Sequence, residues 1–143
     1  MRRLALTVAL VAASCGVAIP PPTLAVPLGT NDFGEYALLV YDDSGLVTGG
    51  LAEALPAFGT SGIVASPERQ ELHVAWTGGA CSHRPTLRVS GTSASLRLEV
   101  ANPMDPQLPF VPISCPAVGI PFGLTLSLSE PVGEDAVTLE VSH

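Results

Sequence analysis

The chain has 143 residues and a formal net charge of −7, and all six of its basic residues are arginines. Only Arg69, Arg84, Arg88 and Arg97 lie beyond the N-terminal segment, scattered among 13 acidic residues. No basic patch can form from them, which excludes nucleic acid and an anionic membrane surface as partners. The length predicts one domain that buries its own core.

Residues 1–25 have the pattern of an export signal. Met1-Arg2-Arg3 is basic, and Leu4 to Ile19 is uncharged and mostly apolar. The three prolines that follow break any helix, and Ala25 places a small residue at a signal-peptidase site. We therefore expect this signal peptide to be cut after Ala25, leaving residues 26–143 as a single β-domain.

A second interpretation of the same segment is a lipoprotein signal that ends before Cys15. Val11-Ala12-Ala13-Ser14-Cys15-Gly16 resembles a bacterial lipobox, in which Cys15 would be acylated and become the new N-terminus. Ala12 departs from the pattern, since lipoboxes usually carry a larger aliphatic residue there. An uncleaved anchor is a third alternative, but the apolar run is short for a bilayer span. Each alternative places the domain outside the cytoplasm, secreted or at the cell surface. With the signal removed, we expect no transmembrane span in the mature chain.

The remaining cysteines, Cys81 and Cys115, form an even pair in an exported chain. Oxidising compartments favour disulfides, so we expect these two residues to be bridged. The bridge would close a loop of about 35 residues and stabilise the domain by roughly 4 kcal/mol through chain entropy. The alternative is a pair of buried free thiols.

The first part of the expected domain is irregular and then extended. Residues 26–34 contain Pro27 and two glycines, and we interpret them as an irregular lead-in. Residues 36–41 are dense in β-formers, residues 42–45 are a turn cluster, and residues 46–48 resume an extended run. Together these three segments predict a β-hairpin.

Two stretches interrupt the expected strands. In residues 49–69, Leu51 to Leu55 predicts one or two helical turns ended by Pro56, and residues 63–65 predict a short strand. Residues 101–116 contain five prolines. We interpret this second stretch as a long loop, because proline cannot donate to a strand ladder.

Five segments in the second half alternate apolar and polar residues with period two, as antiparallel strands with one solvated face do. Trp76 ends the first segment, and we expect it in the core. The expected inward residues are Leu98, Leu126 and Leu139, and the expected outward residues are Arg97, Thr125 and Glu140. The five segments are 72–76, 87–89, 96–100, 124–128 and 137–141.

About seven short strands predict an all-β fold. We expect a small antiparallel β-sandwich, or a squat barrel, of about seven strands with one disulfide. A parallel sheet is not expected, because no run of helical periodicity is long enough for a strand–helix–strand crossover.

The run Trp76-Thr77-Gly78-Gly79-Ala80-Cys81, followed by Cys115-Pro116-Ala117-Val118-Gly119, forms a W-x-G-G-x-C … C-P-x-x-G pattern. With the turn of residues 41–47, this pattern resembles a group of small exported proteins of high-GC Gram-positive bacteria. The resemblance covers most of the expected mature chain and implies an exported protein. Its glycines, tryptophan and cysteines build a fold, so the resemblance implies no functional residue.

No residue pattern indicates catalysis, and we expect a non-enzymatic protein without a metal or cofactor. Gly59-Thr60-Ser61-Gly62 lacks the spacing of a nucleophile elbow. Without the disulfide, Cys81, His83 and Cys115 could supply soft metal ligands, which makes a metal-binding exported protein one alternative.

The composition and the fold class favour an exported interaction or structural module of the cell envelope or extracellular space, with a protein or envelope component as partner. The disulfide would bring His83 and Arg84 close to Phe110, and a cation beside an aromatic ring is the kind of pair that anchors interfaces. The alternative from another class is a secreted protease inhibitor with the proline-rich loop of residues 102–114 as its reactive segment. No feature of the sequence fixes an oligomeric state.

Overall fold

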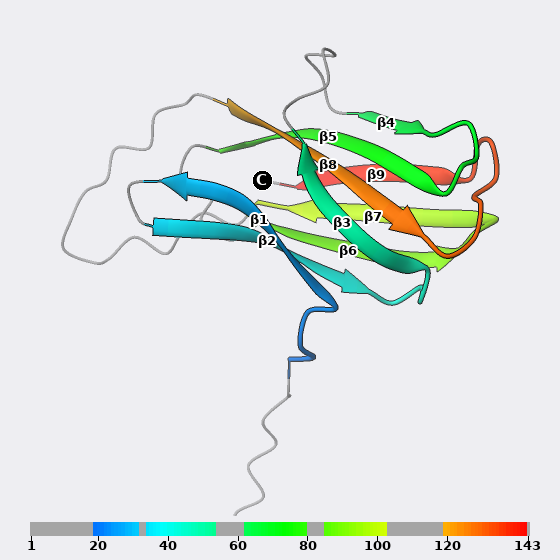
Figure 1. The fold of residues 1–143 in the computed structure, drawn as a ribbon, viewed down its shortest axis with the longest axis horizontal. Coiled ribbons are helices and arrows are strands. Elements are labelled where there is room, and N and C mark those ends of the chain that lie inside the picture. Colours follow the sequence, from blue (N-terminus) through cyan, green and yellow to red (C-terminus); the bar gives the residue numbers. More distant parts are fainter. Residues whose placement is uncertain (1–18, 32–33, 54–61, 80–84, 103–118, 143) are drawn as a thin grey trace, which may run out of the picture.

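A computed structural model describes residues 19–31, 34–53, 62–79, 85–102 and 119–142. These residues form nine strands and no helix, which confirms the all-β fold (Figure 1). Among them there is no helix long and apolar enough to cross a membrane. The strands are β1 (Leu24–Asn31), β2 (Gly34–Asp42), β3 (Val47–Glu53), β4 (Gly62–Ala65), β5 (Glu71–Gly79), β6 (Thr86–Thr92), β7 (Ser95–Ala101), β8 (Gly119–Leu128) and β9 (Val137–Ser142).

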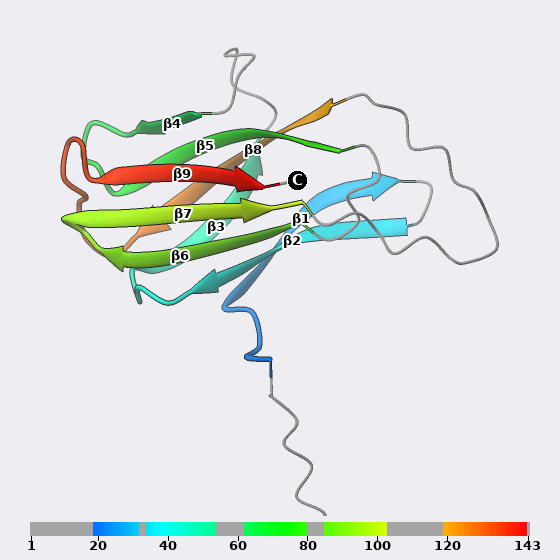
Figure 2. The same ribbon diagram turned by 180° about the vertical axis from the view of Figure 1, so that it is seen from behind.

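The strands form two sheets that pack face to face as a sandwich and do not close into a barrel (Figures 1 and 2). The five-stranded sheet has the order β1-β2-β6-β7-β9, and the four-stranded sheet has the order β3-β8-β5-β4. Strand β1 lies beside β3 at one side of the sandwich, and β9 lies beside β4 at the other. The edges of the two sheets therefore meet along both sides.

The hydrophobic core lies between the sheets, where the period-two alternation of the sequence places it. Leu98 and Leu126 are fully buried, and Leu139 is half-buried against the same cluster. Arg97 and Glu140 are exposed on the opposite face, as expected. Burying a side chain such as leucine contributes roughly 1.5–3 kcal/mol, so this cluster is the main source of stability. Its largest fully buried members are Trp76, Leu38, Leu72, Leu87, Leu96, Leu98, Leu124 and Leu126.

The expected irregular lead-in is wrong, because most of that segment is the edge strand β1. It pairs antiparallel with β2 from Leu24 to Asn31, with a bulge between Pro27 and Gly29. Proline is tolerated at a sheet edge, where its missing N–H faces no partner, and Gly29 takes a φ of 133° that suits glycine alone. The proline and the glycine that made this segment resemble a loop in the sequence are thus residues that an edge strand tolerates.

The expected helical turns from Leu51 onward are also wrong, because Leu51 to Glu53 belong to β3. This strand pairs antiparallel with β8, which satisfies its backbone through the sheet. Two glycines at positions 49 and 50 disfavour a helix here, and pairing with β8 overrides the weak local propensity. The short strand expected at residues 63–65 is confirmed as β4.

Neither sheet of the described strands is a parallel sheet, as expected, but the five-stranded sheet is mixed and contains two parallel strand pairs. Strand β2 pairs parallel with β6, and β7 pairs parallel with β9. Neither connection needs a helix, since the chain crosses to the opposite sheet and back, through β8 in the case of β7 and β9. The sandwich is therefore built mainly of antiparallel pairs with two parallel ones.

Candidate functional site

Most of the site residues predicted from the sequence lie outside the described residues. This holds for the cysteines at positions 15, 81 and 115, and for His83, Arg84 and Phe110. Of the proline-rich loop at 102–114, only Asn102 is described. The disulfide, the loop patch, the inhibitor loop and the soft metal site therefore stay predictions.

The strand ends that flank these segments converge at one end of the sandwich. Gly79, the last residue of β5, is the register partner of Gly119, the first residue of β8. Cys81 follows Gly79 by two residues, and Cys115 precedes Gly119 by four. A few residues of chain span the remaining distance easily, so these strand ends are compatible with the predicted disulfide.

Asn102 fixes the point where the chain leaves β7 for the proline-rich segment. Its Oδ1 accepts a hydrogen bond from Trp76 Nε1 at 3.2 Å, and its backbone N–H donates to the carbonyl of Ser142 at 3.1 Å. The Trp76 ring stacks on Phe122 with centroids 5.4 Å apart. Trp76 is 1% exposed and Asn102 3%, which confirms the tryptophan as a core residue. This arrangement is structural, since solvent does not reach it.

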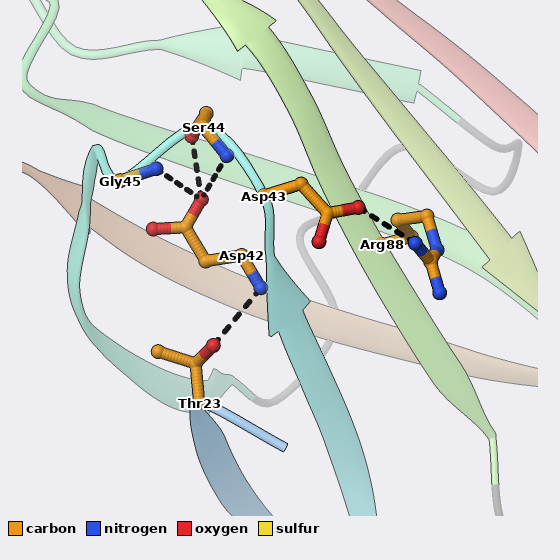
Figure 3. Close-up of polar contacts among 6 residues, drawn as sticks. All are labelled: Thr23, Asp42, Asp43, Ser44, Gly45 and Arg88. Carbon is orange, nitrogen blue, oxygen red and sulfur yellow. Dashed lines mark hydrogen bonds and ion pairs between the residues drawn. The ribbon is translucent and has the colours of Figure 1, made fainter. Parts of the chain in front are cut away.

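The β-hairpin expected for residues 36–48 is wrong, because β2 and β3 lie in different sheets and do not pair with each other. The turn that links them uses its first aspartate as a structural group (Figure 3). Asp42 Oδ1 accepts hydrogen bonds from the Ser44 N–H at 3.0 Å, the Ser44 hydroxyl at 2.5 Å and the Gly45 N–H at 3.1 Å, while Oδ2 accepts from the Val47 N–H at 2.9 Å. Gly45 has a φ of 73°, which the turn requires. The carboxylate of Asp42 is thus engaged by its own loop.

The outer face of the five-stranded sheet carries Arg88 and Arg97, and both arginines are paired with carboxylates. Arg88 contacts Asp43 at 2.6 Å and lies over the Tyr41 ring, 6.0 Å from its centroid. Arg97 contacts Glu140 at 2.7 Å and Glu99 at 3.0 Å. These two carboxylates raise the pKa of Arg97, with Glu140 contributing most.

A shallow depression of about 380 Å³ lies on this charged face, between β6, β7 and β9. Arg88, Glu99 and Glu140 line it together with small residues such as Ala101 and Ser142. Because Arg88 and Glu140 already have ion-pair partners, the depression offers few free charges to a ligand.

The outer face of the four-stranded sheet has a different character. One cross-strand row runs from Leu51 on β3 through Thr125 and His73 to Val64 on β4. Directly opposed residues in a sheet point to the same face, so the four side chains form one line. Leu51 is 68% exposed and Val64 49%, which places an uncovered apolar side chain at each end of the row.

A polar cluster occupies the middle of this row. His73 Nδ1 lies 2.9 Å from Thr125 Oγ1 and 3.2 Å from Glu53 Oε2. Glu53 is the register neighbour of Gly123 on β8, and its carboxylate reaches across β8 to His73 on β5. The Thr125 hydroxyl and then His73 lower the pKa of Glu53, which holds this carboxylate in its charged form.

The geometry of this cluster is not that of a nucleophile triad. In a triad the histidine uses one ring nitrogen for the nucleophile and the other for the carboxylate. Here Thr125 and Glu53 both approach Nδ1 of His73. The cluster therefore orients the imidazole on the sheet surface without activating the threonine.

His73 stands at a polar position of the alternating segment 72–76, and it lies on the outer face of β5 as that alternation predicts. Its partner Glu53 was not predicted from the sequence. Glu53 lay in the segment expected to be helical, and its contact with His73 depends on two strand pairings far apart in the chain. No local pattern carries that information.

The chain matches no protein-family model, no curated protein and no solved structure.

Proposed function

We propose that the protein is an exported β-sandwich that acts as an interaction module and binds its partner on the outer face of the four-stranded sheet. The observation that carries this proposal is the row of Leu51, Thr125, His73 and Val64, in which uncovered apolar side chains flank an ordered polar cluster. An apolar anchor beside positioned hydrogen-bonding groups is the usual composition of a binding surface.

The contrast between the two outer faces supports the choice of face. On the five-stranded sheet, Arg88 and Arg97 have carboxylate partners, and exposed residues such as Thr138 are polar. The described residues include four exposed large hydrophobic side chains: Ile19, Leu51, Val64 and Ile120. Two of the four, Leu51 and Val64, lie at opposite edges of the outer face of the four-stranded sheet. This face therefore exposes large apolar side chains that a partner can cover.

The charge of the chain limits the class of partner. With 13 acidic residues against four arginines beyond the N-terminal segment, the domain repels polyanions and other acidic surfaces. A partner with an apolar contact surface and a neutral or basic rim fits both the row and the net charge. A protein or an envelope component of this kind is the partner that we propose.

Export is supported by the N-terminal sequence and by the resemblance to small exported proteins. Three features of this segment are typical of export signals: the basic Met1-Arg2-Arg3, the apolar run to Ile19 and the lipobox-like residues before Cys15. The predicted pairing of Cys81 with Cys115 fits the same compartment.

Photo-crosslinking in intact cells tests the proposed face. A photoreactive amino acid replaces Leu51 or Val64 on the four-stranded face, and Thr138, exposed on β9 of the other face, serves as the matched control position. The proposal predicts one discrete crosslinked adduct from positions 51 and 64 and none from position 138. Equal adducts from both faces, or adducts from position 138 alone, would contradict it.

A further inference from the structure

The first residues of β1 are held by the strand that follows them. The Thr23 N–H donates to the carbonyl of Val40 at 2.8 Å, and the Asp42 N–H donates to Thr23 Oγ1 at 3.0 Å (Figure 3). Leu24 then pairs with Val40, and Ala25 with Leu39. The ladder therefore begins at Thr23 and continues without a break across the expected cleavage site after Ala25.

Leu24 also closes one side of the sandwich. It is half-buried against the core and lies directly over Gly50 of β3. A Cβ atom at Gly50 would lie 2.9 Å from Leu24 Cδ2 and 3.1 Å from Val26 Cγ2, so β3 approaches β1 closely because it carries a glycine there. Removing Leu24 would leave Val26 as the one β1 side chain that covers Gly50 at the seam between the two sheets.

The described residues that precede Thr23 contribute little to the fold. Ile19 is 83% exposed, and the three prolines after it are exposed as well. The boundary between exposed chain and paired strand therefore falls between Pro22 and Thr23. A cut after Ala25 would remove Thr23 and Leu24 from the domain and leave the Asp42 N–H without its hydroxyl acceptor.

We propose that export processing cuts the chain upstream of Thr23, so that Thr23 and Leu24 remain in the mature domain. This inference rests on the proposed export of the protein. The sequence offers two upstream positions: the bond before Cys15, and the bond after Ala18, where Gly16 and Ala18 place small residues three and one positions before the cut.

The chemistry of the cut is the same at either position. Water adds across one peptide bond, which leaves a carboxylate on the leader and a free amine on the mature chain. For the cut before Cys15, its thiol first receives a diacylglyceryl group from a phospholipid, and the phosphate headgroup leaves with the thiol proton. Both routes keep the strand that begins at Thr23 intact.

Two substitutions in the complete precursor test the inference, with the intact mass and melting temperature of the exported protein as readouts. Leu24→Ala would lower the mature mass by the difference between the two residues, and would lower the melting temperature by several degrees because β1 loses its packing on Gly50. Pro22→Ala is the matched control, since this exposed residue would also change the mature mass but leave the melting temperature unchanged.

The mature N-terminus decides the outcome. A chain that begins at Cys15 or at Ile19 supports the inference, and the lipid mass on Cys15 distinguishes the two cuts. An exported chain that begins at Val26 would have the same mass and melting temperature with and without either substitution. That result contradicts this inference but not the proposed export, and so does an exported chain that keeps Met1. A precursor retained in the cytoplasm instead contradicts the proposed export on which the inference rests.

Discussion

Trp76 Nε1 donates a hydrogen bond to Asn102 Oδ1 at 3.2 Å inside the core, and this contact ties β5 of one sheet to the end of β7 in the other. The indole would otherwise bury an unpaired donor, and the amide would bury an unpaired acceptor. The side chain of Asn102 is the one buried polar side chain among the described residues. Its position makes it the anchor of the chain that continues into the proline-rich segment.

Asn102→Ala should therefore destabilise the domain by about 1–3 kcal/mol, because Trp76 keeps a buried N–H without an acceptor. Urea unfolding of the purified protein measures this loss. Trp76→Phe removes the donor, so the double variant should lose less than the sum of the two single losses. Strictly additive losses would show that the contact carries no energy of its own.

Asp42→Ala should cost about 1–3 kcal/mol, since the turn between β2 and β3 loses the acceptor of four hydrogen bonds. Asp43→Ala is the matched control on the adjacent residue. Its ion pair with Arg88 is half exposed, so its loss should cost less than about 1 kcal/mol. Equal losses of the free energy of unfolding would refute the distinct structural role of Asp42.

Gly50→Ala should lower stability by about 1 kcal/mol, because the new methyl group would meet the buried Val26 and the end of the Leu24 side chain at the seam of the sandwich. Gly49→Ala provides the neighbouring control, where the nearest atom to a new Cβ is 4.0 Å away on Ser127. Thermal unfolding of both variants is the measurement. Similar melting temperatures would mean that β1 and β3 do not approach each other as closely as described.

Stability should fall with acid in part through Glu53. The Thr125 hydroxyl and His73 lower the pKa of Glu53 below its ordinary value of 4.5 in the folded protein. A carboxylate with a depressed folded pKa stabilises the protein above its unfolded pKa, and this contribution disappears as the pH falls through the folded value. Glu53→Gln should therefore reduce the difference in unfolding free energy between neutral pH and pH values below 4.5. An unchanged acid dependence would contradict the contact with Thr125 and His73.

If the protein is exported as proposed, non-reducing mass spectrometry of the material recovered outside the cytoplasm should show Cys81 joined to Cys115. The strand ends at Gly79 and Gly119, from which these residues depart, are register partners. Loss of the bridge in Cys115→Ala should cost about 2–5 kcal/mol. Two free thiols in freshly exported protein would rule out the bridge.

The sequence predicted the strands whose pattern is local and missed those whose identity depends on distant partners. Leu96, Leu98 and Val100 alternate with charged residues, and the burial of β7 follows directly from that period. Strand β1 contains a proline and a glycine that a sheet edge tolerates, so its sequence resembles a loop. Strand β3 has weak local propensity and gains its conformation from pairing with β8.

The candidate site was predictable only in part for the same reason. His73 alternates with buried neighbours, so its exposure on the polar face follows from the sequence. Its neighbours Leu51 and Val64 come from two further strands, and their alignment with His73 needs the order β3-β8-β5-β4. Strand order in a sheet is a property of the whole fold, and one sequence carries no local signal for it.

The most direct test of the proposed binding face is the affinity of the purified domain for the partner that positions 51 and 64 crosslink. Leu51→Asp should weaken binding at least about tenfold, because it removes one leucine contact and places a charge in the interface. Burying a leucine side chain contributes roughly 1.5–3 kcal/mol. Thr138→Asp, which adds the same charge to the opposite face, should leave the Kd within about twofold of the unmodified domain. Equal affinities for Leu51→Asp and the unmodified domain, with both proteins folded, would contradict the assignment of the four-stranded face as the binding surface.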